Sequence, residues 1–132
     1  MRLYDSDYCI SFMRAKVGLS PGSAAQTLGA IKISVITLFE LWTGVHKCSQ
    51  PANELQKLNH FLIGTTTMAM DEADARRAAK IRAHLESKGQ VIGPYDLLIA
   101  AQALEHGMTV VTRNVREFSR VPGLKIDDWN KW

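Results

Sequence analysis

The chain has 132 residues, of which 46% are hydrophobic and 22% are charged, a length and balance that fit one globular domain over residues 1–132. No apolar run approaches the roughly 18 residues of a membrane-spanning helix, and Asp5 and Asp7 stand where a signal peptide needs an apolar core. We therefore expect a cytoplasmic protein with no membrane association. The two cysteines form no CxxC pair, and the net charge of +3 leans only weakly toward a polyanionic partner.

Short apolar strands and longer helices alternate along the whole chain. Apolar and β-branched runs predict strands at residues 1–5, 33–36, 65–70, 109–112 and 124–126. Helical spacing predicts helices at residues 7–16, 24–30, 37–45, 51–62, 71–87, 94–106 and 115–118, with a turn at 18–23. Strands that alternate with such helices pair in parallel through right-handed crossovers. We expect an α/β fold, with a parallel sheet of about five strands and helices on both faces.

Four oxygen-bearing side chains stand where these strands end or the next helices begin. They are Asp5 after the first strand, Glu40 in the first turn of the third helix, Asp96 in the first turn of the helix from Pro94, and Asn114 after strand 109–112. In a parallel α/β sheet the strand C-termini and helix N-termini share one edge, and ligands bind there. We therefore expect the four side chains to converge.

Each acid also has a purely structural explanation. Thr37 and Glu40 have the spacing of a capping box, and Asp7 is placed to cap the first helix. A carboxylate at Asp96 suits the dipole of a helix N-terminus. However, three clustered carboxylates repel one another unless a cation joins them, and oxygen ligands suit a hard ion such as Mg²⁺ or Mn²⁺. Capping and metal binding both stay open for each acid, and the group as a whole favours a metal.

Several stretches of the chain resemble one known family. The opening LYDSDYCI (3–10) resembles the start of PIN-domain ribonucleases of the VapC toxin type, and ISVITLFEL (33–41) resembles their second acidic motif. The most specific match is IGPYDLLIAA (92–101), continued by VTRNVREF (111–118) and VPGL (121–124). The resemblance implies a PIN-like fold and an Mg²⁺- or Mn²⁺-dependent endoribonuclease. It also implies inhibition by a small cognate antitoxin and a homodimer, for which the helices between residues 19 and 62 are the expected contact region.

The resemblance carries a metal-binding role to Asp5, Glu40 and Asp96, and a place in the catalytic site to Asn114. The chain departs from the family pattern at two positions. Asp7 stands where the family commonly has Asn, and Asn114 stands where many PIN domains have a fourth Asp. Since Asn114 offers a carbonyl oxygen but no charge, a second metal would bind only together with substrate phosphate. Water activated by a metal predicts products with a 5′-phosphate and a 3′-hydroxyl.

Substrate contacts are expected beside the same site. Arg113, Arg116 and Arg120 have a spacing that suits backbone phosphates, although a solvated helical face has the same pattern. Ser6 is placed to hydrogen-bond a carboxylate or a metal-bound water. Trp129 and Trp132 are interpreted as packing at the C-terminal edge rather than as base-stacking groups. The resemblance makes tRNA, and initiator tRNA first, the expected RNA.

Three other functions are compatible with the sequence. A receiver-like phosphoacceptor domain also combines an α/β fold with paired acids and Mg²⁺, and Asp5 and Asp7 would then be its acidic pair. A catalytically inactive PIN-like module would bind RNA or an antitoxin without cutting, which the Asn114 departure makes conceivable. A PIN nuclease that acts in RNA processing, outside a toxin pair, is the third.

Overall fold

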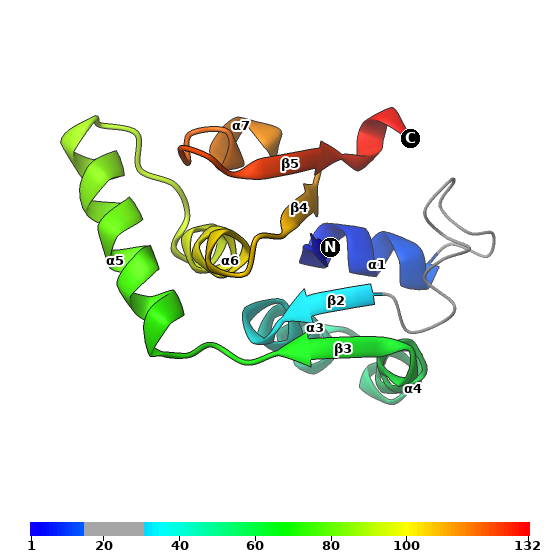
Figure 1. Cartoon of the computed structure of the whole chain (residues 1–132). Helices are drawn as coiled ribbons and strands as arrows, with labels where there is room; N and C mark the ends of the chain where they lie inside the picture. The colour runs from blue at the N-terminus through cyan, green and yellow to red at the C-terminus, as the bar shows by residue number, and fades with distance from the viewer. Residues whose placement is uncertain (15–30) are drawn as a thin grey trace.

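The computed structural model of the chain describes residues 1–14 and 31–132, and the described strands form two parallel sheets. The first sheet has the order β1-β4-β5 and the second pairs β2 with β3. The strands are β1 (Arg2–Tyr4), β2 (Ile31–Ser34), β3 (Thr65–Met68), β4 (Thr109–Thr112) and β5 (Lys125–Asp128). β1 lies alongside β2, so the spatial order is β3-β2-β1-β4-β5 (Figure 1). The expected parallel pairing is confirmed, but the strands form two sheets rather than one, because among the described strands no backbone pairing joins β1 to β2.

Six helices and a short 3-10 turn surround the strands in the described residues. They are α1 (Ser6–Arg14), α3 (Val35–Lys47), α4 (Pro51–Ile63), α5 (Glu72–Ser87), α6 (Pro94–Glu105), α7 (Val115–Phe118) and the turn η1 (Trp129–Lys131). The turn at 18–23 and the helix at 24–30 expected from the sequence lie outside the described residues, as does the end of the first helix. Within the described ranges, no helix has the length and apolar character to cross a bilayer.

Two apolar cores lie on opposite faces of the β1-β4 pair. Alternate residues of a strand point to opposite faces. Leu3 and Val110 belong to one core with α5, α6 and α7, whereas Tyr4 and Val111 belong to the other with α1, α3 and α4. The register pairs Leu3 with Val110 and Tyr4 with Val111, so both strands divide their side chains in the same way. The prediction of helices on both faces is therefore confirmed.

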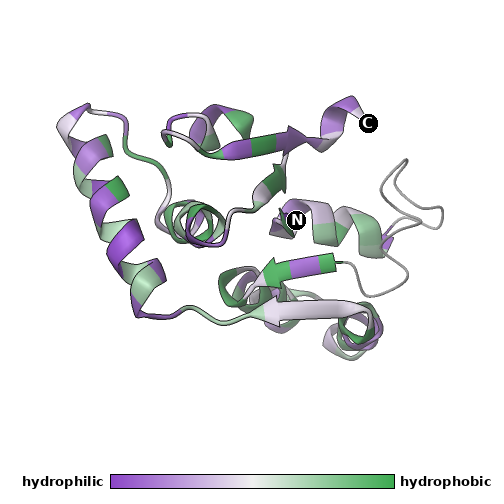
Figure 2. Cartoon of the chain, viewed as in Figure 1, coloured by the Kyte–Doolittle hydropathy of each residue, from purple (hydrophilic) through white to green (hydrophobic). Residues whose placement is uncertain are grey.

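The helix α5 lies on the outside of α6, away from the strands (Figure 1). Hydrophilic residues cover most of its length (Figure 2). The apolar residues that it buries are Ala78, Ile81 and Leu85, at three- and four-residue spacing along one face. That narrow stripe is typical of a helix that packs on one neighbour only.

The boundary between β2 and α3 differs from the expected one. The strand predicted at 33–36 ends at Ser34, and Val35 begins the helix. The Ser34 hydroxyl accepts a hydrogen bond of 3.1 Å from the backbone N–H of Ile36, so Ser34 is the helix N-cap. A cap residue at this position outweighs the strand preference of the two β-branched residues that follow it.

This shift makes the predicted capping box of Thr37 and Glu40 wrong. Thr37 is fully buried inside the helix, and its hydroxyl has no hydrogen-bond partner in the described part of the chain. Glu40 is the sixth residue of α3 and lies in its second turn rather than in the first. The cap at Ser34 leaves the Glu40 carboxylate without a capping role.

Two other strands also end at unexpected residues. β3 ends at Met68, two residues before its predicted end. β5 runs from Lys125 to Asp128 instead of 124–126, because Asp127 and Asp128 stay in register with Val111 and Thr112 of β4. As a result, the residue that follows β5 is Trp129, close to the end of β4.

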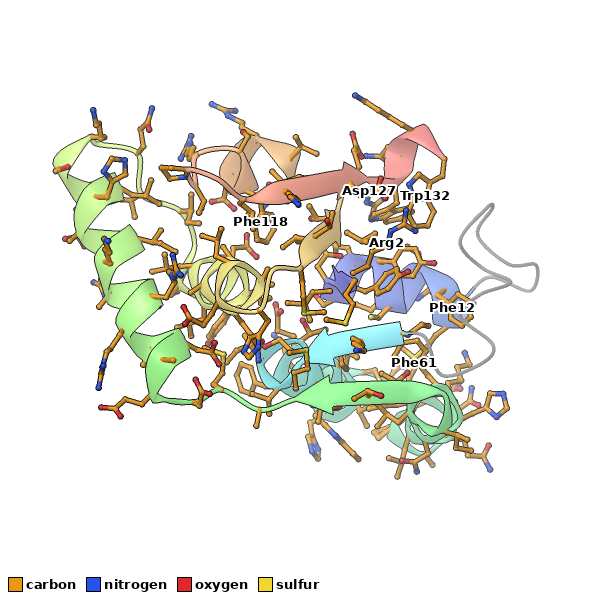
Figure 3. All side chains as sticks on the ribbon, in the orientation of Figure 1. Arg2, Phe12, Phe61, Phe118, Asp127 and Trp132 are labelled. Carbon is orange, nitrogen blue, oxygen red and sulfur yellow. The ribbon has the colours of Figure 1, made fainter. Side chains whose placement is uncertain are left out.

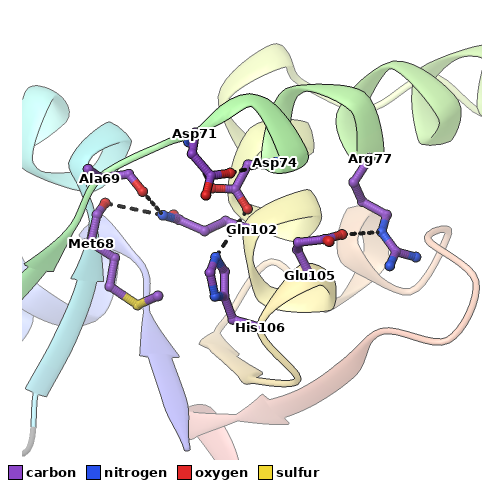
Figure 4. Close-up of polar contacts among 8 residues, drawn as sticks. All are labelled: Met68, Ala69, Asp71, Asp74, Arg77, Gln102, Glu105 and His106. Atoms are coloured by element: carbon purple, nitrogen blue, oxygen red, sulfur yellow. Dashed lines mark hydrogen bonds and ion pairs between the residues drawn. The ribbon is translucent and has the colours of Figure 1, made fainter.

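Polar contacts join helix α6 both to helix α5 and to the segment that connects β3 with α5 (Figure 4). The Gln102 amide, fully buried on α6, donates hydrogen bonds to the carbonyl oxygens of Met68 (3.1 Å) and Ala69 (3.0 Å). Nε2 of His106 lies 3.2 Å from Oδ1 of the buried Asp74 on α5. These contacts set the position of α6, whose first turn carries one of the candidate site residues.

Candidate active site

An open acidic pocket of about 390 Å³ lies where β1 and β4 end. Its lining residues are Asp5, Ser6, Asp7, Glu40, Asp96, Arg113 and Asn114. The four oxygen-bearing residues singled out in the sequence therefore come together, from the β1–α1 junction, α3, α6 and the β4–α7 junction. The expected convergence at one sheet edge is found, and the ligand roles of the four remain predictions.

Asp5 is held rigidly at the end of β1. Its Oδ1 accepts a hydrogen bond of 3.0 Å from the backbone N–H of Tyr8, and its Oδ2 accepts one from the Thr112 hydroxyl. The side chain is 6% exposed. This burial raises the pKa of Asp5 to about 6, because it outweighs the two hydrogen bonds, each of which lowers the pKa. A buried carboxylate that needs stabilisation of its charge is suited to binding a cation.

The same contacts correct the expectation for Asp7. The N–H of Tyr8 near the start of α1 bonds to Asp5, so the cap of this helix is Asp5 and not Asp7. Asp7 is the second residue of α1, is exposed and also lines the pocket. It adds negative charge at the rim without a structural role of its own in these contacts.

Glu40 reaches the pocket from α3 and faces the start of α1. A hydrogen bond from Ser6 lowers its pKa, but burial and the charge of Asp5 raise it more, so the net shift is upward. Ser6 therefore contacts a candidate metal ligand, which is one of the two roles considered for it from the sequence. The upward pKa shifts of Glu40 and Asp5 have a shared main cause, since Asp5 is buried and Glu40 is partly buried, and each lies near other acids.

Asp96 is tied to Asn114 and Glu117 in a hydrogen-bonded group. The Asn114 side-chain nitrogen donates to Asp96 Oδ2 at 2.8 Å and to Glu117 Oε2 at 2.6 Å. Burial, followed by the hydrogen bond and charge of Glu117, raises the pKa of Asp96. The side-chain amide nitrogen of Asn114 thus faces these carboxylates. The sequence had instead suggested that its side-chain carbonyl oxygen would bind a metal ion.

Glu117 is the member of this group that the sequence reasoning missed. It also accepts a hydrogen bond of 3.2 Å from the backbone N–H of Gly93, which immediately precedes α6. The bond from Asn114 is the main reason that its pKa is lowered. The sequence could have indicated this contact through the three-residue spacing of Asn114 and Glu117 at the short predicted helix, because residues i and i+3 of a helix lie on the same face.

Only one of the three arginines expected to bind phosphate lines the pocket. Arg113 does so and is exposed. Arg116 is exposed but is not among the lining residues, and Arg120 instead donates a hydrogen bond of 2.9 Å to the carbonyl oxygen of Val91. Of the three arginines, Arg113 alone therefore borders the pocket, and the phosphate-binding roles stay predictions.

The donor set of the pocket fits a hard divalent cation. Asp5, Glu40 and Asp96 supply carboxylate oxygens, and Mg²⁺ and Mn²⁺ prefer such ligands. Within residues 1–14 and 31–132, no three His, Cys, Asp or Glu side chains lie close enough to share one ion directly. Mg²⁺ usually keeps several of its waters and binds one or two carboxylates, so the wider spacing suits an ion held partly through water.

The strand order, the two-sided helix packing and the acidic edge agree with one domain family. A family model for the PIN domain matches residues 8–124. The chain belongs to the PIN-domain family. This match confirms the resemblance seen in the sequence and excludes the receiver-like alternative.

Similar proteins include nucleases and complexes whose names contain VapC or VapBC. The chain is 42% identical over 97 residues, 74% of each chain, to the tRNA(fMet)-specific endonuclease VapC of Salmonella typhimurium. It is 34% identical over 132 residues, 97% of each chain, to the protein of the same name from Shigella flexneri. A crystal structure of DNA-bound VapBC from Salmonella typhimurium matches with a TM-score of 0.89 and 35% identity over 97% of both chains. VapBC2 from Rickettsia felis, bound to a promoter DNA fragment, matches with a TM-score of 0.85 and 30% identity over 97% of this chain and 98% of that one.

Proposed function

We propose that this chain is a VapC-type toxin, a metal-dependent endoribonuclease that hydrolyses RNA phosphodiester bonds and is neutralised by a cognate antitoxin. The observation that carries the proposal is the convergence of Asp5, Glu40 and Asp96 in one pocket of a PIN domain. Relatives named as VapC nucleases support the activity, at up to 42% identity among those compared. Similar VapBC structures support the antitoxin as partner. Homodimerisation stays a prediction.

The proposed substrate is tRNA, with initiator tRNA as the first choice. It is supported by the names of the Salmonella and Shigella relatives, which are tRNA(fMet)-specific endonucleases. An RNA substrate of this kind places the action of the protein in the cytoplasm. At the pocket, Arg113 offers the cation for the RNA backbone.

In the proposed mechanism, Asp5, Glu40 and Asp96 hold Mg²⁺ or Mn²⁺. When bound, such an ion lowers the pKa of water and neutralises charge on the scissile phosphate. The protein keeps the Asp5 carboxylate in place through the N–H of Tyr8 and the Thr112 hydroxyl. Asn114 orients Asp96 through its side-chain amide.

A cleavage assay of the purified protein on initiator tRNA tests the proposal. We expect cutting with Mg²⁺ or Mn²⁺, none with EDTA, and products that carry a 5′-phosphate and a 3′-hydroxyl. Asp5→Ala and Asp96→Asn are each expected to reduce the rate at least about a hundredfold, because each removes a carboxylate from the proposed ion.

Asp7→Asn is the matched control, because it neutralises an acid of the same pocket that lies outside the proposed ligand set. It is expected to reduce the rate far less than Asp5→Ala. Cleavage that persists in EDTA, or equal rates in the wild type and both ligand variants, would refute the proposed site. Binding of RNA without any cleavage would instead identify the chain as an inactive PIN-like module.

A further inference from the structure

Arg113 is an unusual cation, because it borders a pocket of acids without pairing with any of them. It lines the same pocket as Asp5, Asp7, Glu40 and Asp96. Among the described residues, no ion pair within 4.0 Å involves Arg113. A guanidinium normally forms strong paired hydrogen bonds with a nearby carboxylate. The contact that its guanidinium does make lies outside this group of acids.

That contact is the ring of Trp129. The guanidinium carbon of Arg113 lies 4.6 Å from the ring centroid, within cation–π range. The ring is itself held by Tyr8, which it meets edge to face at a centroid distance of 5.6 Å. Because Trp129 follows β5 directly, the register of β5 with β4 places it next to the residue that follows Thr112.

A stacked guanidinium remains able to bind an anion. Stacking uses the face of the planar group, whereas its five N–H donors lie in the plane and point outward. A phosphate at the pocket rim can therefore be bound in the plane while the ring supports the face. A guanidinium that had closed onto Asp5 or Asp7 would have lost this capacity, because its charge would already be neutralised.

We propose that Trp129 is a positioning residue that holds the Arg113 guanidinium at the rim of the acidic pocket, where Arg113 binds a backbone phosphate of the RNA substrate. The inference rests on the proposed ribonuclease function. It adds Trp129 as the residue that orients Arg113, the arginine that binds the RNA substrate. The ring of Trp129 does not contact the RNA in this arrangement.

The chain offers a matched control in Trp132. Its ring also meets Tyr8 at a centroid distance of 5.6 Å, and Arg2 lies over it at 5.3 Å. Its Nε1 donates to Asp127 at 3.0 Å, and Asp127 also pairs with Arg2 at 2.9 Å. Arg2, Asp127 and Trp132 lie together near the C-terminal end of β5 (Figure 3). Trp132→Leu therefore removes a similar packing contact without touching Arg113.

The test measures KM and kcat for cleavage of initiator tRNA, together with the affinity for the same RNA in EDTA by fluorescence anisotropy. Trp129→Leu is expected to raise KM and the dissociation constant roughly two- to fivefold, the factor of an exposed cation–π contact, with little change in kcat. Trp129→Phe, which keeps an aromatic face, is expected to restore most of the affinity. Trp132→Leu is expected to leave both constants unchanged.

Arg113→Ala separates positioning from packing. It is expected to weaken binding and to lower the slope of log affinity against log salt by roughly one, because one phosphate contact is lost. In this background Trp129→Leu should have no further effect on KM. Thermal unfolding of every variant shows that it is folded at the assay temperature.

Three results would overturn the inference: an unchanged KM in Trp129→Leu, equal effects of Trp129→Leu and Trp132→Leu, or an undiminished effect of Trp129→Leu in the Arg113→Ala background. Failure of the proposed function looks different, since the wild type would then not cut RNA with Mn²⁺. The binding measurements in EDTA still decide the role of Trp129 in that case, and a wild type that binds no RNA would refute both.

Discussion

At the residue scale, Asp5 combines two roles that the sequence assigned to different acids. Its carboxylate caps α1 through the N–H of Tyr8 and also lines the acidic pocket. The capping bond fixes the direction of the carboxylate, and the Thr112 hydroxyl fixes its other oxygen. Asp7, two residues later, is exposed and makes neither contact. The proposed ligand is thus preorganised by the local structure of its own helix.

A prediction at this scale concerns the stability of the metal-free protein. The pKa of Asp96 is raised from 3.8 to about 7, mainly by burial and then by Glu117. An acid whose folded pKa lies above its unfolded pKa costs stability once it ionises, so stability falls as the pH rises from about 4 through about 7. Asp96→Asn should remove this loss and stabilise the metal-free protein at pH 8 by about 1 kcal/mol, a value reduced for its partial exposure.

Thermal unfolding in EDTA between pH 4 and pH 8 measures this effect. The wild type should unfold at a lower temperature than Asp96→Asn at pH 8, and the difference should narrow toward pH 4, where the Asp96 carboxyl of the unfolded chain also becomes protonated. Asp7→Asn is the control for simple removal of one negative charge from the pocket. If Asp7→Asn stabilises the protein as much as Asp96→Asn does, general repulsion rather than the burial of Asp96 is the cause.

At the element scale, the junction of β2 and α3 decides where Glu40 lies. Ser34 ends the strand and caps the helix in one residue, so no loop separates them. The strand is buried and paired with β3, and the helix therefore starts from a rigid support. Glu40, the sixth residue of that helix, is positioned by this support, and it lines the pocket together with Asp96.

Ser34→Ala tests this dependence. Loss of the hydroxyl that accepts from Ile36 is expected to cost about 1 kcal/mol in the free energy of unfolding and to slow cleavage by displacing Glu40. Urea unfolding and the cleavage rate are measured together. Thr43→Ala is the control, since it removes a hydroxyl that bonds to the Phe39 carbonyl within the same helix but caps nothing. Equal effects on cleavage for the two variants would contradict a special role of the junction.

At the scale of the whole molecule, the pocket draws its acids from elements far apart in the chain. Asp5 follows β1, Glu40 lies on α3 and Asp96 lies on α6, on the two sides of the β1-β4 pair. The unfolded chain does not bring these carboxylates together. A divalent ion that binds them should therefore bind the folded state alone and stabilise it.

The expected result is a rise in the unfolding temperature of the wild type with Mn²⁺. A concentration of about a hundred times the dissociation constant would add about 2.7 kcal/mol. Asp5→Ala should abolish most of the rise, whereas Asp7→Asn should keep most of it. A rise of the same size in Asp5→Ala would show that Mn²⁺ binds elsewhere, and this measurement does not depend on catalysis.

The sequence by itself determined the alternation of strands and helices, the parallel pairing and the family resemblance. These follow from local periodicity and from motifs such as IGPYDLLIAA, which can be recognised without knowledge of the tertiary contacts. It also placed Asp5, Glu40, Asp96 and Asn114 at one edge, because parallel strands end together. Helix starts were less predictable, since the capping groups Ser34 and Asp5 compete with neighbouring residues of similar propensity.

Only the tertiary structure decided which side chains meet. Glu117 joins Asp96 through Asn114, and Trp129 meets Arg113, because β4, α7 and β5 pack in one particular register. The division of the described strands into two sheets likewise depends on which strand edges come close enough to pair. Such contacts join residues that are distant in sequence, and a hydrogen bond or a stacked ring depends on relative positions within an ångström or so, which local periodicity does not encode.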